Sequence, residues 1–139
     1  MGQINWPRVV LGGLVAALVM NVSQAIMTQP VLGTQMAAEL TKHNLPPMGG
    51  GAMTFYIVMD FVVGILTVWL YAAIRPRYGP GPKTAIYAGL AVWFLAYFRS
   101  RSSLVVLGVY STGVMAVAIV WGLVETIVAS LAGAWLYRE

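Results

Sequence analysis

Long apolar runs, repeated along a chain of 139 residues, leave this sequence few ways to fold. A helix needs about 20 apolar residues to cross a hydrocarbon core about 30 Å thick. We predict spans at residues 7–27, 52–74, 84–99 and 112–137. Backbone polar groups in lipid must pair within their own segment, so such runs form helices. The sequence therefore predicts an all-α membrane protein, a four-transmembrane-helix bundle that forms one domain over residues 1–139.

The composition supports a lipid environment. Hydrophobic residues make up 60% of the chain and charged residues only 9%, whereas soluble domains carry about 25% charged residues. The net charge of +4 comes from basic residues at the ends of apolar runs, which is the pattern of topology signals and excludes a nucleic-acid surface. Five of the eight basic residues fall on the side of the termini, which predicts that both termini are cytoplasmic. These five are Arg8, Arg75, Arg77, Lys83 and Arg138.

Two connections have distinct characters. Residues 75–82 contain three prolines and two glycines, so we predict a turn. Within the first loop, residues 34–43 can form a short amphipathic helix on the membrane surface, with Met36, Ala37 and Leu40 on one face. A plain structured loop is the alternative there.

Asp60 and Glu125 are the best candidates for functional residues because each lies inside an apolar run. A carboxylate in the bilayer interior costs about 2.5 kcal/mol or more, so it must face protein, water or a partner charge. Both acids, Arg99 and Asn21 lie 13 to 16 residues from the basic residue at the cytoplasmic end of their span. At 1.5 Å per residue this predicts one polar layer roughly 20–24 Å deep. We expect Arg99 to pair with Glu125, Asp60 or both.

Asn21 and Gln24, one turn apart, complete the hydrogen bonds of this polar cluster. Arg101 takes the place of Arg99 if the third span ends earlier. The cluster could be structural, since interhelical polar pairs often only hold helices together, or it could move protons or ions.

Small residues and a short duplication predict how the helices pack. Trp69-Leu70-Tyr71 and Trp135-Leu136-Tyr137 end the second and fourth spans, and each acid precedes its Trp by nine or ten residues. The chain thus reads as two repeated hairpins in parallel orientation. Alternatively, the aromatic residues only mark membrane interfaces. Glycines at small-residue spacing predict close helix contacts. They are Gly12, Gly13, Gly64, Gly122 and Gly133.

The chain shows no motif of a known active site. It has no cysteine, and His43 is its only histidine. We therefore predict no catalytic residue, no metal and no cofactor.

Two stretches carry a resemblance to a known group of proteins. Residues 69–85 (WLYAAIRPRYGPGPKTA) and residues 132–137 (AGAWLY) resemble those of an uncharacterised family of small bacterial integral membrane proteins. The resemblance implies four spans and the bacterial cytoplasmic membrane, and it carries no activity and no site residue.

Two functions fit this pattern. The first is a non-catalytic accessory or structural subunit that packs against a larger membrane complex or against itself. The second is a small proton- or ion-coupled transporter or channel that uses Asp60 or Glu125. An enzyme acting on lipid ranks third. The expected partners are the bilayer and other membrane subunits, and no nucleic acid.

Overall fold

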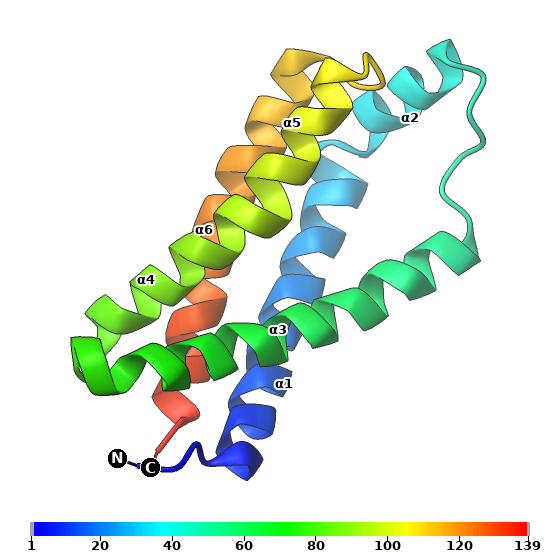
Figure 1. Ribbon diagram of the computed structural model, residues 1–139. Helices are drawn as coiled ribbons and strands as arrows, with labels where there is room; N and C mark the ends of the chain where they lie inside the picture. Colours follow the sequence, from blue (N-terminus) through cyan, green and yellow to red (C-terminus); the bar gives the residue numbers. More distant parts are fainter. Residues whose placement is uncertain (1, 139) are drawn as a thin grey trace.

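Three long helical segments stand side by side, and a fourth crosses them (Figure 1). The computed structural model describes residues 2–138, which are 84% helix with no strand among them. The two termini lie at the same end of the molecule, here called the termini end. The elements are α1 (Trp6–Ile26), η1 (Met27–Val31), α2 (Gly33–Lys42), α3 (Gly50–Tyr78), α4 (Pro82–Val92), η2 (Trp93–Phe98), α5 (Arg99–Val106) and α6 (Thr112–Leu136).

Three of these helical segments are long and apolar enough to cross a membrane. They are Trp6–Val31, Gly50–Tyr78 and Thr112–Leu136. The helices α4, η2 and α5 follow one another without a break, so residues 82–106 form one further long segment beside α6 (Figure 1). The protein is therefore a membrane-embedded helical bundle.

Short polar and glycine signals set the helix ends. The side chain of Asn5 accepts a hydrogen bond from the Arg8 amide at 3.3 Å, and Pro7 occupies the first turn of α1, where a missing N–H costs nothing. Ser111 caps α6 in the same way through the Val114 amide. Gly79 has a positive φ of 85°, which favours glycine and stops α3.

Several predicted boundaries are wrong by one or two turns. The turn predicted over residues 75–82 begins later, because α3 continues through Pro76 to Tyr78 and the Gly79 amide closes its last turn on the Arg75 carbonyl at 2.8 Å. The first span, predicted to end at residue 27, continues as the π-helix η1, which contains Pro30. The helical segment that contains the predicted third span, residues 84–99, runs from Pro82 to Val106, about two turns further than predicted.

Close packing at glycines holds α3 and α6 against α1. A Cβ atom on Gly64 would lie 2.6 Å from the Gly13 carbonyl oxygen, and one on Gly12 would lie 2.5 Å from the Gly133 carbonyl oxygen. These separations are too short for any side chain, so the backbones meet directly, as small residues permit in membrane bundles. Gly89 of α4 similarly faces the Thr126 carbonyl oxygen, at 3.0 Å from an added Cβ.

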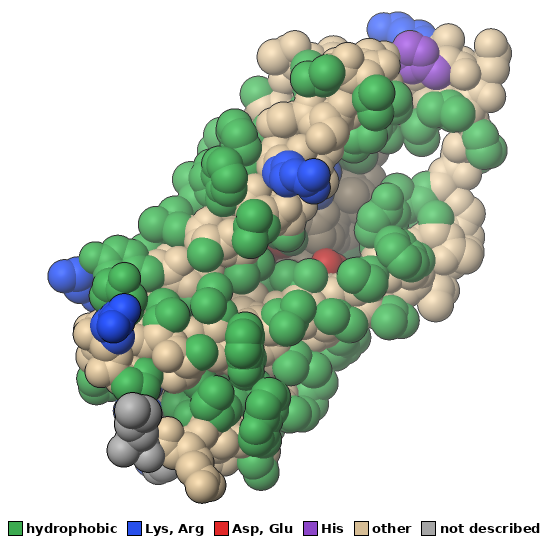
Figure 2. Space-filling view, viewed as in Figure 1, with side chains coloured by type: hydrophobic (Ala, Val, Ile, Leu, Met, Phe, Trp, Pro, Cys, Tyr) green, Lys and Arg blue, Asp and Glu red, His purple; other side chains and the backbone are tan. Residues whose placement is uncertain are grey.

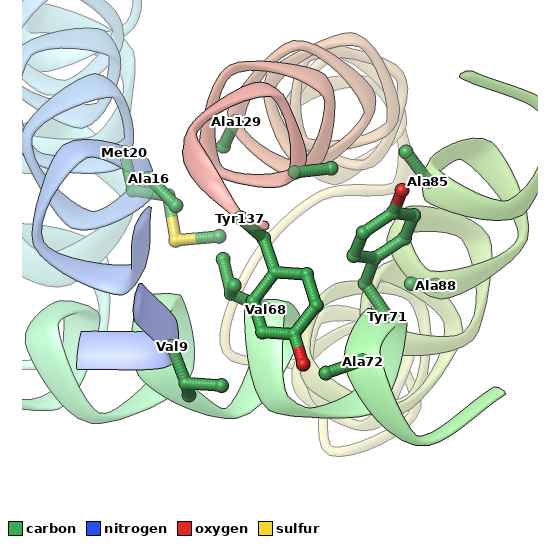
Figure 3. Close-up of a cluster of buried hydrophobic side chains, with 11 residues drawn as sticks. Val9, Ala16, Met20, Val68, Tyr71, Ala72, Ala85, Ala88, Ala129 and Tyr137 are labelled. Carbon is green, nitrogen blue, oxygen red and sulfur yellow. The ribbon is translucent and has the colours of Figure 1, made fainter. Parts of the chain in front are cut away.

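Two tyrosines close the termini end of the core (Figure 3). The rings of Tyr71 and Tyr137 meet edge to face with centroids 6.0 Å apart. The Tyr71 hydroxyl accepts a hydrogen bond from the Gly81 amide, and the Tyr137 hydroxyl accepts one from the Asn5 amide, each at 3.2 Å. Each ring thus fixes the residue that precedes a long helix, and the apolar side chains of all four long segments gather behind them (Figure 3).

At the opposite end, the first part of α3 stands away from the bundle (Figure 1). Residues 50–59, here called the arm, are exposed without exception, and Asp60 is the first half-buried residue after them. The exposed side chains include Phe55, Tyr56 and Val58. The corresponding end of α6 behaves differently, because Met115 and Ala118 are buried against Met27.

Candidate functional site

The most buried charged side chain is Glu125, which is only 4% exposed. Two neighbouring elements supply its hydrogen bonds. Gln24 of α1 donates from Nε2 to Oε1 at 3.1 Å and to Oε2 at 3.0 Å, and the Tyr97 hydroxyl of η2 donates to Oε1. Hydrogen bonds to an ionised group are about twice as strong as neutral ones. Glu125 therefore ties α6 to both α1 and η2 in the interior of the bundle.

Arg101 extends this cluster by one step. Its Nη2 donates to Oε1 of Gln24 at 3.4 Å, and its guanidinium lies 5.4 Å from the centre of the Tyr97 ring. The Gln24 amide accepts from the cation and donates to the anion, so both contacts fix its orientation. The charges of Arg101 and Glu125 are thus coupled through an amide and a ring that both of them contact.

Asp60 lies at the base of the arm, where it is half-buried. Its carboxyl is within electrostatic range of both Glu125 and Arg101. Two carboxylates and one guanidinium therefore share this part of the molecule, drawn from α3, α6 and α5. Figure 2 shows a hollow between the arm and the α4–η2–α5 segment, with an acidic side chain at its base and basic side chains on that segment.

The other two members of the predicted cluster, Asn21 and Arg99, are not among the hydrogen-bond partners of Glu125. Asn21 donates from Nδ2 to the Ala17 carbonyl of its own helix at 3.1 Å. Arg99 has an exposed side chain, and the hydrogen bonds of the cluster come from Arg101. The two arginines are two residues apart, so they point about 200° apart on a helix and only one can face the bundle.

Local sequence explains how Tyr97 reaches Glu125. Gly122 lies about one turn before Glu125, and a Cβ there would collide with the Tyr97 ring. The π-helix η2 carries Tyr97 and is anchored to α6 by Trp93, whose Nε1 donates to the Ile119 carbonyl at 2.9 Å. π-Helical segments are frequent at functional sites because they re-aim single side chains.

A second polar contact lies beside the cluster. Trp121 of α6 donates from Nε1 to the Ser23 hydroxyl of α1 at 2.8 Å. The two residues border an open groove of about 730 Å³ between α1 and α6, whose other walls are mainly valines. Because Glu125 is almost completely buried, its carboxylate is turned into the bundle and the groove is essentially apolar.

Sequence reasoning missed three of these groups. They are Tyr97, Trp121 and Ser23, none of which the sequence analysis singled out. The available signal was spacing: Gly122 one turn before Glu125 leaves room for one large ring from a neighbouring helix.

The chemistry available here is that of a carboxylate pair, a phenol, an amide and a guanidinium. Among residues 2–138, no group of three or more His, Cys, Asp or Glu side chains is placed to hold a metal ion. Comparisons with models of protein families, with curated proteins and with solved structures give no match for this chain.

Proposed function

We propose that the protein is a non-catalytic, integral membrane subunit whose role is to associate with another membrane protein chain, or with itself. The single observation that carries this proposal is the arm. Ten consecutive helical residues are all exposed, although α3 is buried at Gly64, Thr67, Val68, Tyr71 and Ala72 further along.

Lipid acyl chains alone would not solvate the polar side chains in the hollow beside the arm. Asp60, Gln24 and Arg101 lie there and are each only partly buried. Charged groups that face lipid cost several kcal/mol, so they normally face protein or water. A helix from another chain would cover the hollow and give the apolar arm a packing partner.

We also propose that residues 82–106 form a fourth span. The 25 residues of α4, η2 and α5 would extend about 37 Å as a regular α-helix, and residues 84–98 carry no charge. With four spans the two termini share a side, and the excess of basic residues there favours the cytoplasm. The proposed location is the bacterial inner membrane, in keeping with the resemblance of residues 69–85.

A duplicated hairpin is a further part of the proposal, and the tyrosine contacts support it. Tyr71 and Tyr137 differ by 66 positions, and the residues whose amides they bind, Asn5 and Gly81, differ by 76. The same offset of 76 relates Gly13 to Gly89. Each of these glycines packs against the second helix of its hairpin, Gly13 at Ile65 and Gly89 at Thr126 and Ser130.

Purification of the tagged full chain from membranes in mild detergent tests the proposal. A stoichiometric companion protein, or a defined oligomer, supports a subunit role. A lone monomer in the same detergent that leaves the arm accessible to a water-soluble maleimide at an engineered Phe55→Cys contradicts it.

The second candidate function is a small proton- or ion-coupled transporter or channel. The observation that favours it is the electrostatic coupling of Asp60 and Glu125, two carboxylates that share one guanidinium inside the bundle. Uptake into proteoliposomes driven by a proton gradient tests this function. Loss of uptake in Glu125→Gln, with the fold intact, would support it over the first.

A further inference from the structure

Resting on the proposed function, we infer that the partner is a second copy of this chain and that the two copies exchange their arms. In this arrangement the arm of one chain lies in the hollow of the other, between the partner's arm and its α1 and α5. The hollow that receives an arm is here called the seat.

Moving the arm into the seat of its own chain would cost packing energy in α3. Directly after Asp60, α3 is held by Gly64 against Gly13, and then by Val68 and Tyr71, which are 1% and 4% exposed. Swinging the whole helix would break all of these contacts. Bending it instead requires a kink between residues 59 and 64, a stretch with neither Pro nor Gly before Gly64, and sharp kinks almost always need such residues.

The second hairpin contains a side-chain contact whose equivalent in the first hairpin would lie in the seat. There, Tyr97 of η2 packs against Gly122 of α6. Under the offsets of 76 and 66, the equivalent pair in the first hairpin is Asn21 and Tyr56. In the present chain this equivalent contact is vacant, because Tyr56 is 56% exposed and Asn21 bonds only to its own helix.

The two surfaces complement each other in polarity as well as in register. The arm has no charged residue, and its most prominent polar side chain is Tyr56. A phenol can donate to and accept from the amides and carboxyl of the seat. Inserted at Asn21, the Tyr56 hydroxyl would therefore lie near Gln24 and Asp60.

Each chain has one arm and one seat, so an exchange between two copies leaves neither unused. Such an interface is self-complementary about a two-fold axis, the commonest symmetry of oligomers. The six large arm side chains from Met53 to Met59 are 38–60% exposed. Covering them in both copies would bury on the order of 1,000 Å² together with a similar area of seat, which is the range of stable interfaces.

Disulfide trapping in native membranes tests the exchange, since the natural chain has no cysteine. Two differently tagged chains are co-expressed, one carrying Asn21→Cys and the other Tyr56→Cys. We expect oxidation to produce a band of twice the monomer mass that carries both tags. The matched control replaces Tyr56→Cys with Val58→Cys, which lies about 200° around the same helix and should give no cross-linked band.

Three results are decisive. The mixed-tag band, together with a dimer of the unsubstituted chain in native mass spectrometry, supports the exchange. A disulfide that forms only within a chain carrying both substitutions, with the protein monomeric, overturns it and shows that the arm closes on its own seat. No disulfide from a chain that co-purifies with a different membrane protein overturns the exchange while leaving the subunit function in place.

Discussion

The sharpest test of the fold is the substitution Gly64→Ala. The new methyl group would lie 2.6 Å from the Gly13 carbonyl oxygen and 2.7 Å from the Ala17 amide nitrogen. Ordinary van der Waals contact begins near 3.4 Å, so α1 and α3 must separate by about 0.8 Å (3.4 minus 2.6). Both obstructing atoms belong to the backbone, so no side-chain rotation relieves the collision.

The expected cost follows from that separation. Overpacking a tight core costs about 1–3 kcal/mol, and a gap of 0.5–1 Å between helices forfeits roughly a quarter to a half of each contact's dispersion energy. We expect Gly64→Ala to lower the free energy of unfolding by about 1–3 kcal/mol, a factor of roughly 5 to 150 in the unfolding equilibrium constant.

Gly113→Ala is the matched control. Gly113 also lies in a membrane helix, but a Cβ there meets nothing within 4 Å. Alanine is better than glycine in helices by about 0.5–1 kcal/mol, so this variant should be as stable as the natural chain or slightly more stable. The two identical chemical changes are thus expected to have opposite signs.

The assay is reversible unfolding in mixed micelles by added sodium dodecyl sulfate, followed by circular dichroism. If Gly64→Ala and Gly113→Ala unfold at the same detergent fraction, the direct backbone contact between α1 and α3 does not exist. The crossing of α3 over the bundle, and the arm that results from it, would then have to be abandoned.

Three other predictions concern the polar cluster and the tyrosine pair. Gly122→Ala should displace the Tyr97 ring, lower stability by about 1–3 kcal/mol and change the near-ultraviolet circular dichroism of the aromatic residues. Arg101→Gln should destabilise the protein by about 1.5–3 kcal/mol, because its charged hydrogen bond and its compensation of two carboxylates are lost. The control Arg99→Gln should change stability by less than about 0.5 kcal/mol. Equal effects of the two substitutions in the same micelle titration would contradict the assignment of Arg101 to the cluster. Tyr137→Phe should cost about 0.5–1.5 kcal/mol through its bond to the first helix cap, and hydrogen exchange should rise at the start of α1.

Much of the helical architecture is predictable, because the length and hydrophobicity of each apolar run can be read directly from the sequence. The apolar run at 52–74 falls within α3, and the run at 112–137 ends one residue beyond α6. Of the glycines selected for their spacing, Gly12, Gly13, Gly64 and Gly133 lie at close backbone contacts, and Gly122 lies against the Tyr97 ring. Helix ends were harder. Pro76 reads as a helix breaker, yet α3 passes it, because a proline in the last turn sacrifices only one backbone bond.

The composition of the polar cluster was only half predictable, and the reason is geometric. Depth along a span can be counted at 1.5 Å per residue, so Glu125 and Gln24 were placed together. The direction of a side chain around the helix depends on packing and on local changes of pitch. The π-helix η2 shifts every residue after Trp93 relative to a regular helix, and this shift accompanies the choice of Arg101 over Arg99.

The position of Asp60 links the fold to its proposed association. Inward of Asp60, towards the termini end, α3 is bound to the bundle by glycine contacts and by Tyr71. Beyond it, every residue of the helix is exposed. The carboxylate at this junction disfavours filling of the hollow by lipid, because a charge in contact with hydrocarbon is energetically costly. The polar side chains of the seat therefore need polar partners, and the apolar side chains of the arm need a protein surface to pack against. A single chain meets neither requirement, whereas a second copy in the same orientation meets both.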